Sequence, residues 1–237
     1  MRAMVLVGGR GTRFRPLTFA VPKPLLAIGD KPLLQHLLER LHGAGITDVV
    51  LATGYLAELI EAFCGDGSRF GLRITYCREP MPLGTAGPLS LIRDQVRADE
   101  FILLMNGDIV TDLAYRDLLE FARKGDYPLT VAYVEHTYKS PFGVLQITDG
   151  LITDVIEKPE MRSFVSSGIY VVKGSALRSV PDRTFFTVPE LMQRLREAGE
   201  QVGAYPVTGM WVGVEDLGEL EKVRGLMGME ATEADET

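Results

Sequence analysis

The chain has 237 residues, of which 46% are hydrophobic and 24% are charged, and its formal net charge is −7. This composition is typical of a globular protein with a sizeable core. The negative charge argues against general binding to nucleic acid or to an anionic membrane, because both need a basic surface. No apolar run approaches the ~20 residues of a membrane span, and the apolar run at the start is too short for a signal peptide. We therefore expect a soluble, cytoplasmic protein.

A basic, glycine-rich loop follows the first predicted strand. Residues 3–7 form a short apolar run that is typical of a buried parallel strand. In residues 8–13 (GGRGTR), the glycines allow a sharp turn and let backbone N–H groups approach an anion closely. Five basic residues precede the first acidic residue, Asp30. The pattern predicts a phosphate site, with a solvated surface turn as the alternative. The spacing matches neither a P-loop nor a dinucleotide fingerprint.

Helices and strands alternate after this loop. The apolar periodicity predicts helices over residues 32–44 and 55–63, and strands over residues 47–52 and 72–77. This rhythm favours a parallel sheet with helices on both faces. Ligands of such sheets bind beyond the carboxyl ends of the strands, which is where the glycine-rich loop falls.

A second glycine-rich turn, residues 82–89, leads into a predicted helix that ends near Val96. Backbone groups of such a turn can reach the edge of a nucleobase. Alternatively, the turn is only a connection in which Thr85 caps a helix. The sequence by itself leaves both interpretations open.

The central strand is predicted over residues 101–105, and Asn106, Gly107 and Asp108 follow it directly. A carboxylate at the end of a buried strand lies where ligands bind, and Mg²⁺ is usually held by one or two carboxylates together with phosphates. Asp108 is therefore a candidate metal ligand. The alternative is that it caps the next helix, predicted over residues 114–122.

The second half of the chain predicts a β-hairpin with a turn at Asp149 and Gly150, followed by Glu157 and Lys158. In isolation, these two charged residues are typical of an exposed surface pair. The predicted elements of this half are strands over residues 129–134, 142–147, 151–156 and 164–172, a helix over residues 188–198 and an edge strand over residues 201–206.

Several of these motifs together resemble those of the sugar nucleotidyltransferases, also called NDP-sugar pyrophosphorylases. The family's motifs read GGxGTRxxPLT, PKP, LGTAG (in guanylyl- and some adenylyltransferases), NGD, FGV, EKP and VNAGIYV. The chain is most similar to mannose-1-phosphate guanylyltransferase-like short members, which lack a carboxyl-terminal β-helix domain. In the same order, the matching residues are 8–18, 22–24, 83–87, 106–108, 142–144, 157–159 and 165–171.

The resemblance implies an α/β fold with a single Rossmann-like (GT-A-like) domain over residues 1–227. Its mixed, mostly parallel central sheet is flanked by helices, and a small antiparallel β subregion holds the sugar. We expect the acidic tail, residues 228–237, to be disordered. The sequence contains no hexapeptide repeat, so we expect no β-helix domain.

The resemblance also implies an activity, the Mg²⁺-dependent transfer of a nucleotidyl group from an NTP to a sugar 1-phosphate with release of pyrophosphate. GTP is favoured, and adenylyl, uridylyl, cytidylyl or thymidylyl transfer is the alternative within the class. The partners are then these small molecules, and a homodimer is compatible with the sequence.

The implied roles fall into three groups. The catalytic residues are Arg13, Lys23 and Asp108, and Asp108 also holds Mg²⁺. The nucleotide-binding residues are Val7, Gly8, Gly9, Gly11, Thr12, Leu83, Gly84, Thr85 and Gly107, and the sugar-phosphate-binding residues are Gly143, Glu157, Lys158 and Ser166.

The sequence departs from the family at two positions. Ser166 stands where the family has an asparagine that hydrogen-bonds the sugar, and serine offers one hydroxyl in place of an amide. Gly213 stands where the family has an aspartate, its second metal ligand, for which Glu215 or Asp216 is a candidate replacement. These departures suggest an unusual sugar or cyclitol phosphate. They also leave open a non-catalytic, regulatory relative that binds a nucleotide sugar. A metal-dependent glycosyltransferase is disfavoured, because no D-x-D motif follows the central strand.

Overall fold

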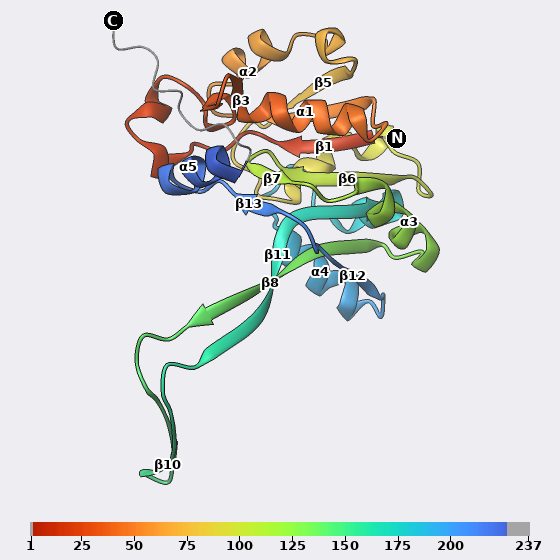
Figure 1. Cartoon of the computed structure of the whole chain (residues 1–237). Coiled ribbons are helices and arrows are strands. Elements are labelled where there is room, and N and C mark those ends of the chain that lie inside the picture. Colours follow the sequence, from red (N-terminus) through yellow and green to blue (C-terminus); the bar gives the residue numbers. More distant parts are fainter. Residues whose placement is uncertain (1, 227–237) are drawn as a thin grey trace, which may run out of the picture.

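A seven-stranded sheet is the centre of the computed structural model, which describes residues 2–226 (Figure 1). The strand order is β12-β8-β11-β6-β1-β4-β5, and only β11 runs antiparallel to its neighbours among these seven described strands. The sheet is therefore mixed and mostly parallel, and the predicted α/β fold is confirmed. In sheet order, the strands are Val202–Pro206, Leu129–Lys139, Glu160–Lys173, Phe101–Asn106, Arg2–Leu6, Asp48–Thr53 and Arg73–Arg78.

Helices cover both faces of the sheet. The side chains of each strand alternate between the two faces, so both faces carry apolar side chains that need to be buried. Ala3 and Val5 of β1 belong to one buried cluster, and Met4 belongs to another. The first cluster includes side chains of three α-helices, and the second includes those of one α-helix and two 3-10 helices. In that order, these are α1 (Leu33–Gly43), α2 (Ala57–Cys64), α3 (Tyr115–Gly125), α4 (Val188–Glu197), Gly87–Gln95 and Gly174–Ser179.

The predicted elements are present, and three of them differ in kind or length. The helix expected to end near Val96 is a 3-10 helix, in which the Ser90 hydroxyl donates to the Gly87 carbonyl oxygen at 2.7 Å. The strands predicted over residues 129–134 and 164–172 are both longer in the structure. The expected disordered tail lies outside the described residues. No helix in the described part of the chain is long and apolar enough to cross a membrane.

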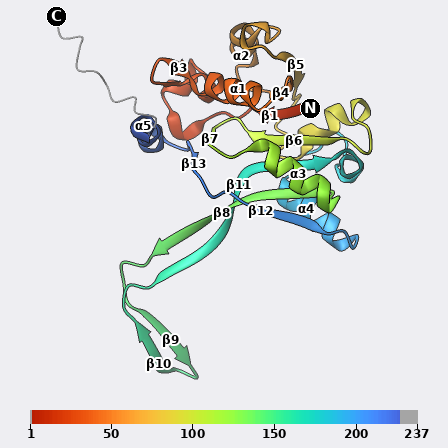
Figure 2. The ribbon, with the colours of Figure 1, turned by 45° about the vertical axis from the view of Figure 1, so that its right-hand side comes forward.

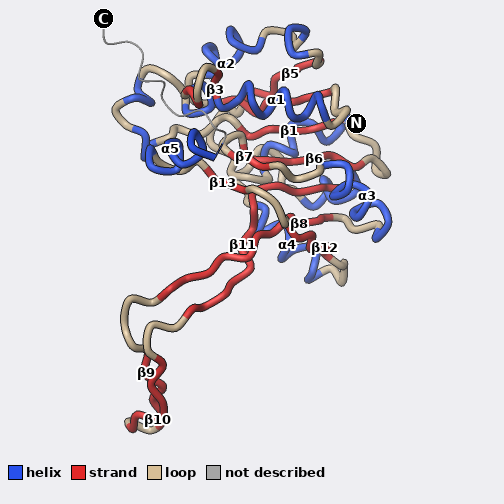
Figure 3. The backbone as a smooth tube through the Cα atoms, viewed as in Figure 1, coloured by secondary structure: helices blue, strands red, loops and turns tan. Residues whose placement is uncertain are grey.

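β8 and β11 continue together beyond the central sheet as an arm, which we define as residues 135–165 (Figures 1 and 2). The arm leaves the sheet next to a register shift in β11 between Ser166 and Tyr170. β9 (Val144–Thr148) and β10 (Leu151–Ile156) form the predicted hairpin at its far end. The expected antiparallel subregion therefore exists, but it lies on this arm, away from the central sheet (Figure 3).

A third buried cluster attaches the glycine-rich loop to the last part of the described chain. Phe14, which is 1% exposed, is the member that follows the loop. Its neighbours come from β2 (Ala27–Ile28), which pairs with β3 (Lys31–Pro32), and from the start of α1. Others come from the paired strands β7 (Ile109–Thr111) and β13 (Trp211–Gly213), from Val214, which follows β13, and from α5 (Leu217–Leu226). The buried members are Phe14, Ile28, Leu33, Val110, Val212, Val214, Leu220 and Val223.

We expect Phe14→Ala to lower the free energy of unfolding by about 3–5 kcal/mol, because it removes a fully buried aromatic side chain from this cluster. Phe19→Ala is the matched control, since Phe19 is 62% exposed. Chemical unfolding of the two variants measures the difference. Equal losses in both variants would contradict the role assigned to the third cluster.

Candidate active site

The glycine-rich loop lies at the carboxyl ends of β1 and β4. The Val7 N–H donates to the Ala52 carbonyl oxygen at 2.9 Å, and the Tyr55 N–H donates to the Gly8 carbonyl oxygen at 3.1 Å. A Cβ added at Gly54 would lie 3.0 Å from the Gly8 carbonyl oxygen, so the two backbones are in close contact. The loop thus lies at the edge of the sheet where ligands of such folds bind.

Gly11 lets the chain fold back onto Lys23. Its φ is +56°, and an added Cβ would lie 3.0 Å from both Lys23 Cβ and Thr18 Cγ2. The buried Thr18 hydroxyl donates to the Gly11 carbonyl oxygen at 2.8 Å. The Lys23 ammonium then lies 5.3 Å from the centroid of the Phe14 ring and forms an ion pair with Asp108.

Asp108 lies at the turn between β6 and β7, directly beside the end of β1. The Gly107 N–H donates to the Leu6 carbonyl oxygen at 2.9 Å, and an added Cβ at Gly107 would lie 2.6 Å from Val7 Cγ1. Only glycine allows this approach. The residues around this contact line a cavity of about 140 Å³, which we call the loop cavity. The loop cavity is lined by Leu6, Val7, Gly9, Gly11, Lys23, Pro24, Gly107 and Asp108.

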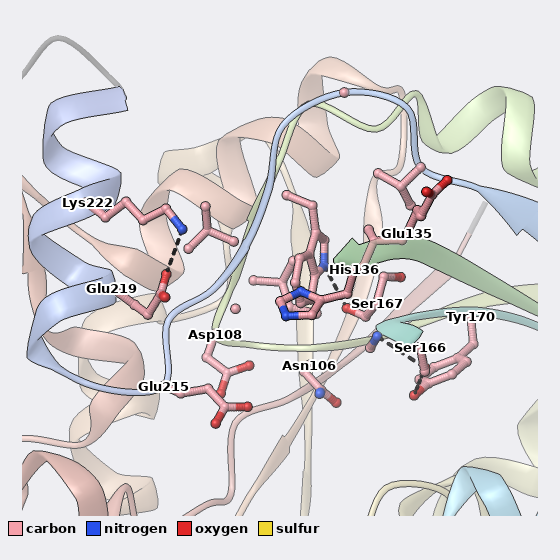
Figure 4. A pocket seen from close by; sticks show the side chains of 18 of the residues that line it. Asn106, Asp108, Glu135, His136, Ser166, Ser167, Tyr170, Glu215, Glu219 and Lys222 are labelled. Atoms are coloured by element: carbon pink, nitrogen blue, oxygen red, sulfur yellow. Dashed lines mark hydrogen bonds and ion pairs between the residues drawn. The ribbon is translucent and has the colours of Figure 1, made fainter. Parts of the chain in front are cut away.

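Asp108 also lines a second, larger cavity of about 780 Å³, which we call the cleft (Figure 4). The cleft extends from Asp108 to the root of the arm, and its lining includes Asn106, Ser166 and Trp211. Five carboxylates border it, whereas its basic side chains are Lys222, 3.6 Å from Glu219, and His136. The cleft is therefore acidic. The five carboxylates belong to Asp108, Glu135, Glu215, Asp216 and Glu219.

β13 brings the position of the missing aspartate next to Asp108. Gly213 pairs with Ile109, and the Val214 N–H donates to the Asp108 carbonyl oxygen at 2.9 Å. Glu215 borders the cleft near Asp108 (Figure 4) and forms an ion pair with Arg13. By contrast, one carboxylate oxygen of Asp216 accepts the Glu219 N–H at 2.9 Å in the first turn of α5. Of the two candidate replacements, Asp216 is thus engaged in capping a helix.

The carboxylates of Asp108 and Glu215 suit a hard divalent cation. Mg²⁺ is commonly held by one or two carboxylates, with phosphates and water completing its shell. No group of three His, Cys, Asp or Glu side chains that could hold a metal occurs in residues 2–226, so phosphate oxygens would have to supply further ligands. The residues fit a Mg²⁺ ion that binds together with its phosphate ligand.

The second glycine-rich turn is joined to the first by Glu79, which the sequence patterns did not single out. One Glu79 carboxylate oxygen accepts the Leu83 N–H at 2.8 Å, and the other lies 2.8 Å from a Cβ built at Gly8. Burial raises the pKa of the Glu79 carboxyl above its ordinary value, although the hydrogen bond from Leu83 partly opposes this. The sequence signal that could have identified Glu79 is its place between the two glycine-rich turns, as a carboxylate shortly before the second one.

The turn itself packs against the segment before α4. Gly84 has a φ of +77°, and an added Cβ would lie 2.7 Å from the Phe186 carbonyl oxygen. The Thr85 hydroxyl accepts the Val188 N–H at 2.9 Å, so it interacts with the start of α4 and not with the helix that follows the turn. This arrangement leaves backbone groups as the means by which the turn could bind a base.

The predicted sugar-phosphate residues are divided between two places. Ser166 borders the cleft, and its hydroxyl lies 2.9 Å from the Tyr170 hydroxyl. Gly143, Glu157 and Lys158 lie on the arm and border neither the cleft nor the loop cavity. Gly143 and Glu157 are neighbours there, since an added Cβ at Gly143 would lie 2.8 Å from a Glu157 carboxylate oxygen. The structure therefore does not bring the complete predicted site together within one chain.

The nucleotidyl transferase family matches residues 2–227. The chain belongs to this family. Mannose-1-phosphate guanyltransferase beta-A of Xenopus laevis is 33% identical over 220 residues, which are 90% of this chain and 61% of that protein. The chain thus spans about three fifths of the length of such relatives.

Solved structures share the fold. HddC from Yersinia pseudotuberculosis has a TM-score of 0.75 at 22% identity, and the match covers 95% of this chain and 99% of that one. A Bacillus anthracis protein solved in complex with sucrose has a TM-score of 0.76 at 24% identity and covers 95% of both chains.

We expect the Glu79→Gln variant to become more stable, relative to the wild type, as the pH rises. Burial favours the protonated form of Glu79 and so raises its pKa in the folded chain. The stability that this protonated carboxyl contributes is fully present below the ordinary pKa of 4.5 and is lost as the pH rises through the folded-state pKa. Chemical unfolding at about pH 4 and about pH 7 measures the shift in this difference. Glu200→Gln is the control, because it removes a carboxylate at an exposed position and so measures the effect of losing such a group without burial. A difference that is independent of pH would contradict the burial of Glu79 between the two turns.

Proposed function

We propose that this chain transfers a nucleotidyl group from an NTP, with GTP favoured, to a sugar 1-phosphate, and releases pyrophosphate with the aid of Mg²⁺. The observation that carries the proposal is the position of Asp108, whose side chain borders both the loop cavity and the cleft. Two phosphorylated substrates bound on its two sides meet at one carboxylate. The names of relatives that are 33% to 34% identical support mannose 1-phosphate as the first acceptor to test.

The physical problem of this reaction is the repulsion between two phosphates that must come into line. The loop backbone at Gly9 and Gly11 binds the triphosphate, and Lys23 places a positive charge between the two phosphates. An oxygen of the sugar phosphate attacks the α-phosphorus in line, and the bond to the leaving pyrophosphate breaks without a covalent enzyme intermediate. Arg13 neutralises the leaving pyrophosphate. Asp108 and Glu215 would hold Mg²⁺, which would supply positive charge to offset the repulsion between the phosphates.

The second glycine-rich turn supports the preference for GTP. Guanine presents N–H donors on its base-pairing edge, and a carboxylate is an acceptor for them. Glu79 supplies such a carboxylate between the two turns, and the backbone of Gly84 supplies further polar groups. The Leu83 N–H and carbonyl oxygen are bonded to Glu79 and to the Phe186 N–H, so Leu83 acts by holding Glu79 in place. Because the Thr85 hydroxyl is bonded to Val188, we assign only the backbone of Thr85 to nucleotide binding.

The proposal is tested by measuring pyrophosphate release with each common NTP against a panel of sugar 1-phosphates. We expect Mg²⁺-dependent turnover with GTP and one acceptor, and a loss of at least about 100-fold in Asp108→Asn. Asp94→Asn, an exposed change away from both cavities, is the matched control and should keep its activity. Absence of turnover together with tighter binding of a finished nucleotide sugar than of GTP would favour the regulatory alternative.

We expect Glu215→Gln to weaken Mg²⁺ binding by about tenfold or more, whereas Asp216→Asn should leave the affinity unchanged. Trp211 is the one tryptophan of the chain and borders the cleft, so its fluorescence reports a Mg²⁺ titration in the presence of a non-hydrolysable GTP analogue. This readout does not depend on turnover.

The same titration also tests whether an aspartate at position 213 can replace Glu215 as a metal ligand. A Cβ added at Gly213 meets only the Trp211 ring, at 3.6 Å, so a side chain can start at this position without a clash. In the Glu215→Gln background, Gly213→Asp should restore Mg²⁺ affinity. Unchanged affinity in Glu215→Gln, or a loss only in Asp216→Asn, would refute Glu215 as the second ligand.

A further inference from the structure

The arm exposes apolar side chains along its whole length. No residue from 135 to 164 is buried, although all of them lie in the described part of the chain. Of the nineteen exposed large hydrophobic side chains among the described residues, eleven belong to the arm. Soluble proteins rarely leave such a surface uncovered, and an isolated two-stranded ribbon is only marginally stable. The eleven are Tyr138, Phe142, Val144, Leu145, Ile147, Leu151, Ile152, Val155, Ile156, Met161 and Phe164.

The arm also holds the predicted acceptor residues away from the cleft of their own chain. The β8–β11 ladder is continuous from the pair Tyr133 and Ser166 to the pair Lys139 and Glu160. Six residues of strand at about 3.3 Å each put the far end of this ladder about 20 Å from its root. Gly143, Glu157 and Lys158 follow beyond that point, in a segment that we call the elbow (residues 140–143 and 157–159). For these three residues to reach the cleft of their own chain, the pairing between β8 and β11 would have to break.

A sugar phosphate in the cleft needs a positively charged partner, and Lys158 of the elbow carries such a charge. It borders five carboxylates, and its lysine, Lys222, lies close to Glu219, so a sugar phosphate lacks a free ammonium partner there. The ion pairs of the arm join Lys139 to Glu160 and Arg162 to Glu135, and Lys158 takes part in neither.

The backbone at Lys158 is a second, independent indication. Its φ is +46°, in the left-handed region that residues with a side chain avoid. The following Pro159 restricts this position to extended conformations as well. Strain of this kind is concentrated at functional positions, where the surrounding structure maintains it. We take it as support for a binding role of Lys158.

We propose that two copies of this chain exchange their arms, so that the elbow of each copy completes the sugar-phosphate half of the other copy's cleft. Under a two-fold axis the two arms run side by side in opposite directions, and each elbow then lies at the root of the other arm. The apolar side chains of the arms pack together, and Lys158 supplies the missing ammonium. The role given to the elbow rests on the proposed function, whereas the exchange itself does not.

The exchange is tested first by the mass of the full chain in solution, measured by sedimentation equilibrium. We expect a dimer for the wild type and a monomer for the double variant Phe142→Ser, Phe164→Ser, whose two rings are 74% and 72% exposed in a single chain. The matched control, Phe19→Ser with Leu59→Ser, changes exposed apolar residues away from the arm and should remain a dimer. A monomeric wild type, or dissociation of the control as well, overturns the exchange.

The donation of the elbow is tested by complementation. Lys158→Ala and Asp108→Asn chains with different tags are co-expressed, and the mixed dimer is purified. In an exchanged dimer one of its two sites combines an intact Asp108 with an intact Lys158, so we expect about half of the wild-type activity, although each variant alone is inactive.

The outcomes of this experiment separate the two proposals. An inactive mixed dimer beside an active wild type overturns the donation and places the elbow's role, if any, within its own chain. An inactive wild type overturns the proposed function, and the mass measurement then decides the exchange by itself.

Discussion

The ion pair between Lys23 and Asp108 is the contact on which the rest of the site depends. It joins the segment after the glycine-rich loop to the end of the central strand β6, and Asp108 is the residue shared by the loop cavity and the cleft. Two glycines make the contact possible: Gly11 lets the loop fold onto Lys23, and Gly107 lets β6 end against β1. A larger side chain at either position would displace one member of the pair. The acidic and basic groups of the proposed reaction are therefore positioned by backbone packing.

The position of the glycine-rich loop and of Asp108, the half of the site that we propose for the nucleotide, could be predicted from the sequence, because its determinants are local. The apolar runs and the glycines that follow them specify strands ending in tight turns, and residues 8–13 and 106–108 lie where these patterns put them. Glu79 was missed because its significance depends on two turns that meet only in the folded chain. The choice between Glu215 and Asp216 likewise needed the start of α5, where Asp216 accepts a backbone N–H.

The arm could not be predicted, because strand length beyond the sheet is decided by pairing between residues far apart in sequence. The alternation in residues 142–156 indicates a hairpin but says nothing of where it lies. The consequence for function is an asymmetry between the two halves of the site. One chain assembles the loop cavity and Asp108, whereas the acceptor half has only Ser166 of its four predicted residues at the cleft. The departures at Ser166 and Gly213 both lie in this less complete half.

The proposed function requires two phosphorylated ligands to bind on opposite sides of Asp108. A crystal structure with Mg²⁺, a non-hydrolysable GTP analogue and mannose 1-phosphate would show where each of them lies. We expect the triphosphate against the backbone at Gly9 and Gly11, the sugar phosphate in the cleft, and the metal in contact with Asp108. A triphosphate bound in the cleft, or a metal that does not contact Asp108, would refute this arrangement.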